Sequence, residues 1–234
     1  MTDVGQRGAL VLVHGGWHGS WCWEHLIPEL DGGWTVSTVD LPSVDGDPNV
    51  SMYDDAQAIR DHLDGIDGPI TVLAHSYAGI PVSEIAGTVP NVTRLIYLAA
   101  HMLEVGESAA SALPGEPSDP PEPPDLWPVF GNAREVFYFD VQADWADAAV
   151  TRLRPQSRRV LYDKQTRAAW QMIPSALVLC DEDHVIPEFF QKRGETFAKL
   201  VRRLPGGHSP FLSRPYELAK LINEIAEDLP GCTG

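Results

Sequence analysis

A serine stands between small residues directly after an apolar run, in Thr71-Val72-Leu73-Ala74-His75-Ser76-Tyr77-Ala78-Gly79. The run predicts a buried strand and the residues after Ser76 predict a helix, so the serine falls on a strand-to-helix turn. Such a turn lifts a serine hydroxyl out of a sheet, where it can act as a nucleophile. Ala74 and Ala78 occupy positions where larger side chains would collide in so tight a turn. The same pattern also fits an ordinary turn whose serine caps the helix.

A serine nucleophile needs a base, and the base needs an acid that orients it. Both residue types follow Ser76 along the chain, each after a predicted strand. The base candidate is His208, which follows two glycines in a loop before a helix. The acid candidates are Asp181 and Asp183, and the residues alone leave both open. A lone loop histidine is more often simply solvated, but the order serine, acid, histidine raises the odds of a catalytic set.

A glycine-rich loop follows the first predicted strand, at His14-Gly15-Gly16-Trp17. Acyl transfer requires hydrogen-bond donors for the negative oxygen that develops in the transition state. A backbone N–H of this loop and that of Tyr77 would supply two such donors. Standing alone, the loop would be read as a simple turn.

The predicted elements alternate between strands and helices, which indicates an α/β fold with a mostly parallel sheet of about six strands flanked by helices. Apolar runs predict strands at residues 9–13, 69–74, 92–99 and 174–180. A second strand is expected at residues 34–40, and residues 199–203 are a candidate for a last short strand. Helical periodicity predicts helices at residues 20–30, 51–63, 76–89, 145–153, 187–200 and 215–225. The alternation of strands and helices is interrupted over residues 101–172, which we interpret as an inserted helical cap. Residues 1–100 and 173–234 would form the core.

The inserted segment 101–172 is rich in proline and in aromatic residues. Seven prolines fall within residues 112–128, which excludes a continuous helix or strand there. The segment also holds eight of the 20 aromatic residues of the chain. We expect Trp127, Phe139 and Trp145, with Phe130 and Phe137, to roof an apolar substrate pocket. The alternative is that these residues form a small core of the segment itself.

Composition excludes several classes of function. The chain has 234 residues, 44% of them hydrophobic, and a net charge of −16. Because a surface this acidic repels phosphate groups, we expect no nucleic-acid partner and no binding to anionic membranes. Three cysteines without CxxC or HExxH spacing give no disulfide framework and no metal site. With no signal peptide evident, we expect a cytoplasmic protein, and a homodimer is left open.

Four segments together resemble the α/β-hydrolase superfamily. They are LVHGGWHGSWCW at 12–23, LAHSYAG at 73–79, CDEDHVIP at 180–187 and GGHSPFLSRP at 206–215. Within that superfamily the sequence is similar to the branch of small plant methyl esterases and hydroxynitrile lyases. The resemblance implies Ser76 as nucleophile, His208 as general base and Asp183 as acid. It also implies Gly16 and Tyr77 as oxyanion donors, and it implies no cofactor.

The resemblance also bears on substrate and reaction. It makes Trp17 a neighbour of the oxyanion site. Trp17, His18 and His101 are candidates for the substrate-binding wall. Core or surface roles fit the two histidines equally. Hydroxynitrile lyases of this branch carry a threonine and a lysine where this chain has Gly15 and Ser209. We therefore expect a carboxylic ester hydrolase for a small-molecule ester. Lyase-like or lactonase activity, or non-catalytic metabolite binding, are the alternatives.

Overall fold

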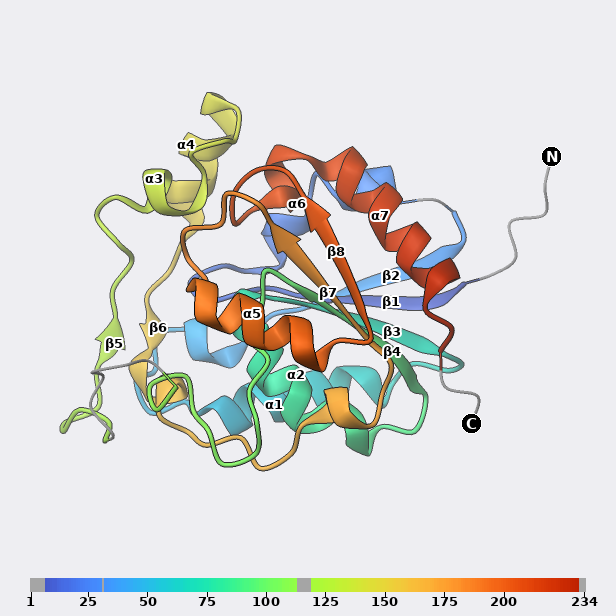
Figure 1. Cartoon of the computed structure of the whole chain (residues 1–234). Coiled ribbons are helices and arrows are strands. Elements are labelled where there is room, and N and C mark those ends of the chain that lie inside the picture. Colours follow the sequence, from blue (N-terminus) through green and yellow to red (C-terminus); the bar gives the residue numbers. More distant parts are fainter. Residues whose placement is uncertain (1–6, 31, 113–118, 232–234) are drawn as a thin grey trace.

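A six-stranded parallel sheet forms the centre of the protein (Figure 1). The computed structural model describes residues 7–30, 32–112 and 119–231. The strands follow the order β2-β1-β3-β4-β7-β8 across the sheet. Their bounds are β1 (Gly8–Val13), β2 (Trp34–Val39), β3 (Ile70–His75), β4 (Val92–Leu98), β7 (Ser175–Cys180) and β8 (Leu200–Leu204). The predicted α/β fold and sheet are confirmed.

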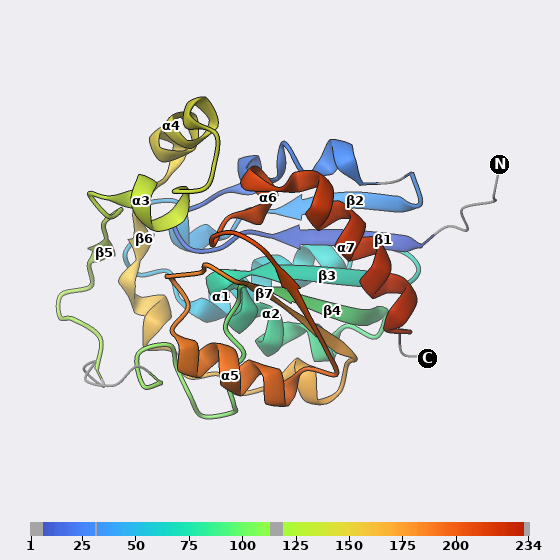
Figure 2. The ribbon, with the colours of Figure 1, turned by 45° about the horizontal axis from the view of Figure 1, so that its top comes forward.

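Helices cover both faces of the sheet because the strands are apolar on both sides. Along β1, Val11 and Val13 pack into one core layer, while Leu10 and Leu12 pack into the other. The first layer is covered by α1 (Met52–Leu63), α2 (Gly79–Ile85) and α5 (Glu188–Phe197). The second is covered by α6 (Pro210–Ser213) and α7 (Pro215–Asp228), seen in front of the sheet in Figure 2.

Local sequence explains where these helices begin and end. Helix α1 begins at a capping box, in which Ser51 and Asp54 exchange side-chain and backbone hydrogen bonds. The helix predicted over residues 20–30 is wrong. The chain there forms two short 3-10 helices, η1 (Ser20–Trp23) and η2 (Ile27–Glu29), because Pro28 lacks the N–H that a continuous helix would need. Further 3-10 turns are η3 (Pro42–Val44), η4 (Ser76–Ala78), η5 (Ala86–Thr88), η6 (Arg158–Leu161) and η7 (Ala169–Gln171).

The middle part of the segment 101–172 lies beyond the edge of the sheet where the parallel strands end (Figures 1 and 2), whereas its last part, at η7, packs beside α2. It holds β5 (Leu126–Trp127), α3 (Ala133–Phe137), α4 (Ala143–Arg152) and β6 (Gln156–Ser157). Strands β5 and β6 pair antiparallel as a separate ribbon. The helix predicted over residues 145–153 corresponds to α4. Of the residues singled out in the sequence, Pro114, Pro117 and Cys232 lie outside the described residues.

In the part of the chain that the structure describes, no helix has both the length and the apolar character needed to cross a membrane. In the same residues, no three His, Cys, Asp or Glu side chains gather in a way that would hold a metal ion.

Candidate active site

Ser76 directly follows β3, at the carboxyl edge of the sheet, and begins the 3-10 helix η4. Its φ of 56° lies in the left-handed region, which a residue with a side chain seldom adopts. Such backbone strain tends to gather at functional positions. Trp17 (φ 61°) and Ala99 (φ 43°) share this conformation, and they too follow strands of the sheet. The strain therefore marks the same edge as the candidate nucleophile.

The loop after β1 packs directly against Ser76. A methyl group built on Gly15 would lie 2.8 Å from Ser76 Cβ and 2.8 Å from His75 Nδ1, so only glycine fits there. One built on Gly16 would lie 3.9 Å from Tyr77 Cβ. Tyr77 stands in the first turn of η4, where backbone N–H groups have no partner within the helix. The two residues expected to donate to an oxyanion are therefore neighbours.

His208 and Asp183 form a buried hydrogen-bonded pair at the ends of β8 and β7. The His208 Nδ1 atom lies 3.0 Å from Asp183 Oδ2, and the two side chains are 1% and 2% exposed. Asp183 Oδ1 accepts backbone N–H groups of Val185 and Ile186 at 2.7 and 3.1 Å. Burial raises the pKa of Asp183, but His208 and these N–H groups outweigh burial and hold it below its ordinary value. Asp183 is thus suited to orient the imidazole as a carboxylate.

Asp181, the competing acid, points elsewhere. Its Oδ1 pairs with Arg203 Nη1 at 3.2 Å on the surface, and its side chain is 49% exposed. The residue immediately before the nucleophile, His75, is fully buried and donates from Nε2 to the backbone oxygen of His208 at 3.0 Å. Burial lowers the pKa of His75 far below its ordinary value, so it is a neutral support for the His208 loop.

His18 lies beside this centre with both ring nitrogens in use. Its Nδ1 donates to the Gly16 carbonyl at 2.7 Å, so Nε2 accepts the Tyr138 hydroxyl at 2.8 Å. Burial lowers the pKa of His18 to about 3, which keeps the ring neutral. These two hydrogen bonds join the glycine loop to the segment 101–172, and a place for His18 in the substrate-binding wall stays a prediction. The buried Nδ1 of His101 has no hydrogen-bond partner among the described residues, and burial lowers the pKa of His101 to about 4.

Aromatic rings of the segment 101–172 gather over Trp17. Ring centroids lie 4.4 Å from Trp17 for Trp127, 4.9 Å for Phe130 and 5.7 Å for Phe137. The Phe137 ring is also 6.1 Å from His208, so the cluster reaches the candidate base. These four rings, Trp17, Trp127, Phe130 and Phe137, are called the aromatic cluster below.

Two residues expected in the pocket wall are not part of the aromatic cluster. Trp145 stacks on His25 at 3.8 Å between ring centroids, where α4 meets the turn after η1. Phe139 is 40% exposed and lies 5.7 Å from the His184 ring. The segment therefore uses Trp145 to dock on the core, and Phe139 covers the Gly207 backbone at the surface.

The likeness to known proteins extends over nearly the whole chain. A model of the alpha/beta hydrolase family matches residues 10–221. The chain belongs to this family. The alpha/beta hydrolase nvfD of Aspergillus novofumigatus is 28% identical over 245 residues, covering 94% of this chain and 97% of its own. Methylesterase 7 of Arabidopsis thaliana is 24% identical over 260 residues, covering 96% and 98%. The resemblance to the methyl esterase branch is thereby confirmed.

Solved structures give the same result for the fold. A pyrethroid hydrolase from Sphingobium faniae JZ-2 superposes with a TM-score of 0.80 at 25% identity, covering 94% of this chain and 97% of that one. Polyneuridine aldehyde esterase superposes with a TM-score of 0.81 at 23% identity, covering 94% and 100%. The latter likeness shows the fold alone.

This alpha/beta hydrolase also holds a buried polar group that the sequence reasoning missed. Asp55 on α1 is fully buried and accepts the Tyr77 hydroxyl at 2.7 Å and the Ser43 N–H at 2.9 Å. One signal in the sequence could have found it. Asp55 falls on the apolar face of the helix that carries Met52 and Ile59, where an unpaired carboxylate would be costly.

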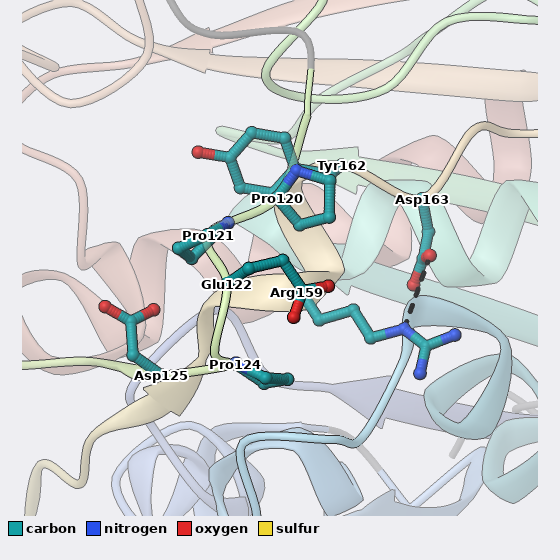
Figure 3. Close-up of a pocket in the computed structure, with 8 residues that line it drawn as sticks. All are labelled: Pro120, Pro121, Glu122, Pro124, Asp125, Arg159, Tyr162 and Asp163. Atoms are coloured by element: carbon teal, nitrogen blue, oxygen red, sulfur yellow. Dashed lines mark ion pairs between the residues drawn. The ribbon is translucent and has the colours of Figure 1, made fainter.

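A separate hollow of about 330 Å³ lies beside the proline-rich stretch (Figure 3). An ion pair of 3.7 Å between Arg159 Nε and Asp163 Oδ1 joins two of its lining residues. Its lining is Pro120, Pro121, Glu122, Pro124, Asp125, Arg159, Tyr162 and Asp163. None of the candidate catalytic residues lines it, so we give it no part in the chemistry.

Proposed function

We propose that this alpha/beta hydrolase cleaves carboxylic esters through an acyl-enzyme, with Ser76, His208 and Asp183 as the catalytic triad. The observation that carries the proposal is the buried His208–Asp183 pair, 3.0 Å between Nδ1 and Oδ2, at the edge of the sheet where the strained Ser76 lies. A buried acid bonded to Nδ1 holds the ring in the tautomer whose Nε2 accepts a proton. Esterases among the relatives support the same reading.

The chemistry follows from these roles. Ser76 Oγ attacks the ester carbonyl carbon while its proton passes to His208 Nε2. The carbonyl oxygen becomes an oxyanion, which the N–H groups of Gly16 and Tyr77 stabilise. Collapse breaks the bond to the alkoxy oxygen, which takes the proton from His208 and leaves as an alcohol. Water then repeats the attack on the acyl-serine, and the carboxylic acid departs.

We argue the substrate class from the side chains beside the candidate base. The aromatic cluster reaches the candidate base through Phe137, whose ring is 6.1 Å from His208. Apolar side chains beside the reacting groups favour neutral acyl groups of small to medium size. Ser209, which follows the candidate base, carries no charge to stabilise a leaving cyanide. We therefore assign an ester and not a cyanohydrin as the substrate.

A fluorophosphonate probe tests the proposal, because it labels only an activated serine. We expect labelling of the wild-type chain and none of Ser76→Ala. Ser83→Ala is the matched control. Ser83 is a buried serine on α2 whose hydroxyl is hydrogen-bonded to Tyr97, and this variant should label like the wild type. Absence of labelling in a folded wild-type chain would favour a binding protein, and labelling of Ser76→Ala would assign the nucleophile elsewhere.

A further inference from the structure

A chain of buried polar groups runs behind the two candidate oxyanion donors. The Tyr77 hydroxyl donates to Asp55 Oδ2 at 2.7 Å, and Asp55 Oδ1 accepts the backbone N–H of Ser43 at 2.9 Å. The Ser43 hydroxyl in turn accepts the Gln156 side-chain amide at 3.1 Å. The exposed fractions are 6% for Tyr77, 1% for Gln156 and 0% for the two between them. The chain joins four elements, because these residues lie on η4, α1, η3 and β6.

The far end of this chain returns to the glycine loop. A methyl group built on Gly16 would lie only 2.6 Å from Gln156 Oε1, so the amide oxygen packs against the Gly16 backbone. Gln156 comes from β6 in the segment 101–172, beside the sheet edge in Figure 1. One side chain of that segment thus contacts the loop of the first donor, and through Ser43 and Asp55 it reaches the second.

We propose that Gln156, Ser43 and Asp55 are positioning residues that fix the Gly16 and Tyr77 N–H groups relative to each other, so that oxyanion stabilisation depends on how β6 docks. This inference rests on the proposed ester hydrolysis. We call the four residues Gln156, Ser43, Asp55 and Tyr77 the positioning chain.

The physical reason is that oxyanion stabilisation is sensitive to small displacements. Donors act only when they lie near 2.7–3.1 Å from the developing oxyanion, and loss of one donor costs about 10²–10³ in kcat. Gly16 has no side chain of its own to anchor it, and Tyr77 sits on a strained turn. Buried, fully bonded polar groups hold their neighbours rigidly, because breaking one bond leaves another group without a partner. His18 already holds the Gly16 carbonyl at 2.7 Å, and the positioning chain adds a contact on the Gly16 backbone and links it to the side chain of Tyr77.

The first test removes one end of the positioning chain without touching a donor. Tyr77→Phe keeps the backbone N–H and deletes only the hydroxyl that Asp55 accepts. We expect kcat for p-nitrophenyl butyrate to fall about tenfold or more, with KM changed less than about twofold. The matched control is Tyr97→Phe, which deletes an equally buried hydroxyl bonded to Ser83 at 2.7 Å. It should lose comparable stability against urea but keep its kcat.

The second test addresses the Gln156 end. Gly16→Ala forces Gln156 Oε1 to move, and Gln156→Ala removes it altogether. Because both changes break the same contact, we expect the double variant to lose no more kcat than Gly16→Ala alone. If the fold-loss in kcat of the double variant equalled the product of the two single losses, Gln156 and Gly16 would act separately, and this would overturn the proposal.

The third measurement separates positioning from a general loss of structure. A trifluoromethyl ketone forms a tetrahedral adduct with an oxyanion, whereas the matching methyl ketone binds mainly as the ground-state carbonyl. For Tyr77→Phe and Gln156→Ala, we expect the inhibition constant of the fluorinated ketone to rise in proportion to the loss of kcat/KM, with that of the methyl ketone unchanged. Equal weakening of both ketones, or normal kcat in both variants, would refute the positioning role.

The outcome also distinguishes the two proposals. If Ser76→Ala keeps esterase activity, the proposed function fails whatever the positioning variants do. If Ser76→Ala is inactive while Tyr77→Phe and Gln156→Ala match the wild type, only the positioning role fails. Should Gln156→Ala not fold, the conservative Tyr77→Phe variant decides.

Discussion

Ser76 and His208 are expected to work as one unit, since the nucleophile is weak until the base takes its proton. Replacing either by alanine should lower kcat/KM for an activated ester by roughly 10³-fold or more. The double variant Ser76→Ala/His208→Ala should lose little beyond either single change. Initial rates with p-nitrophenyl butyrate give kcat/KM for the two single variants and the double variant. A double variant whose fold-loss equals the product of the two single losses would contradict a shared mechanism.

The two neighbouring aspartates should differ sharply. Asp183 holds His208 at 3.0 Å, whereas Asp181 pairs with Arg203 on the surface. An asparagine at 183 would stabilise the wrong tautomer of the ring, at a cost of roughly 10³–10⁴-fold in kcat. Asp181→Asn removes only an exposed ion pair, worth about 1 kcal/mol or less of stability. Measuring kcat for Asp183→Asn and for Asp181→Asn tests this expectation. A larger loss of kcat in Asp181→Asn would assign Asp181 as the acid of the triad.

At this scale the sequence predicted the residues that stand at strand ends. Ser76 and Asp183 each follow an apolar run, His208 follows the mixed strand β8, and parallel strands bring their carboxyl ends to one edge. Gln156 could not be found in this way, because its partner Ser43 is 113 residues away and neither has a motif. The role of His18 was likewise hidden, since its partner Tyr138 is 120 residues distant.

Among the elements, the regular strands and helices were predictable and the irregular ones were not. Strands β1, β3, β4 and β7 were predicted because apolar runs of that length admit few alternatives, whereas the edge strands β2 and β8 have mixed sequences, WTVSTV and LVRRL, that carry a weaker signal. The helix over residues 20–30 was wrong because apolar periodicity outweighed Pro28 in the prediction. The placement of Trp145 on His25 also lay beyond the sequence, since aromatic content does not say which surface a helix docks on.

Asp55 makes the stability of α1 depend on pH. Burial raises its pKa from 3.8 to about 6, although Tyr77 and Ser43 act against this through hydrogen bonds. Ionisation is therefore harder in the folded chain, so the free energy of unfolding falls as pH rises from about 4 to 6 and levels off above. Asp55→Asn removes this dependence. Between pH 4.5 and 7.5 the wild type should lose about 2 kcal/mol relative to the variant.

Urea unfolding at the two pH values measures this difference. The matched control is Asp54→Asn, one residue away on the same helix. Hydrogen bonds from Ser51 lower the pKa of Asp54, so its contribution has the opposite sign, present above the ordinary pKa and lost as pH falls. A wild-type stability that rises relative to Asp55→Asn over the same range would show that Asp55 is not a buried carboxylate with a raised pKa.

For the molecule as a whole, family membership defines the fold and the kind of chemistry but not the substrate. The relatives at 28% and 24% identity span nearly the whole chain, yet differ in what they are named for. In such a family, specificity depends on the side chains of inserted segments and loops, while the sheet stays the same. The aromatic cluster and the surface charge are therefore the features from which a preference must be argued.

We expect a preference for neutral acyl groups larger than acetyl. Each methylene buried against the aromatic cluster is worth about 0.8 kcal/mol, roughly fourfold in kcat/KM. A carboxylate on the acyl group should lower kcat/KM, because the chain carries a charge of −16 that repels an anion on approach. We expect p-nitrophenyl butyrate, octanoate and benzoate to exceed acetate in kcat/KM, and hemisuccinate to be poor. Added salt should narrow the hemisuccinate gap by screening the repulsion and leave the neutral esters unchanged. A clear preference for acetate would exclude an apolar acyl site beside Phe137, and fast hemisuccinate hydrolysis would exclude the electrostatic barrier.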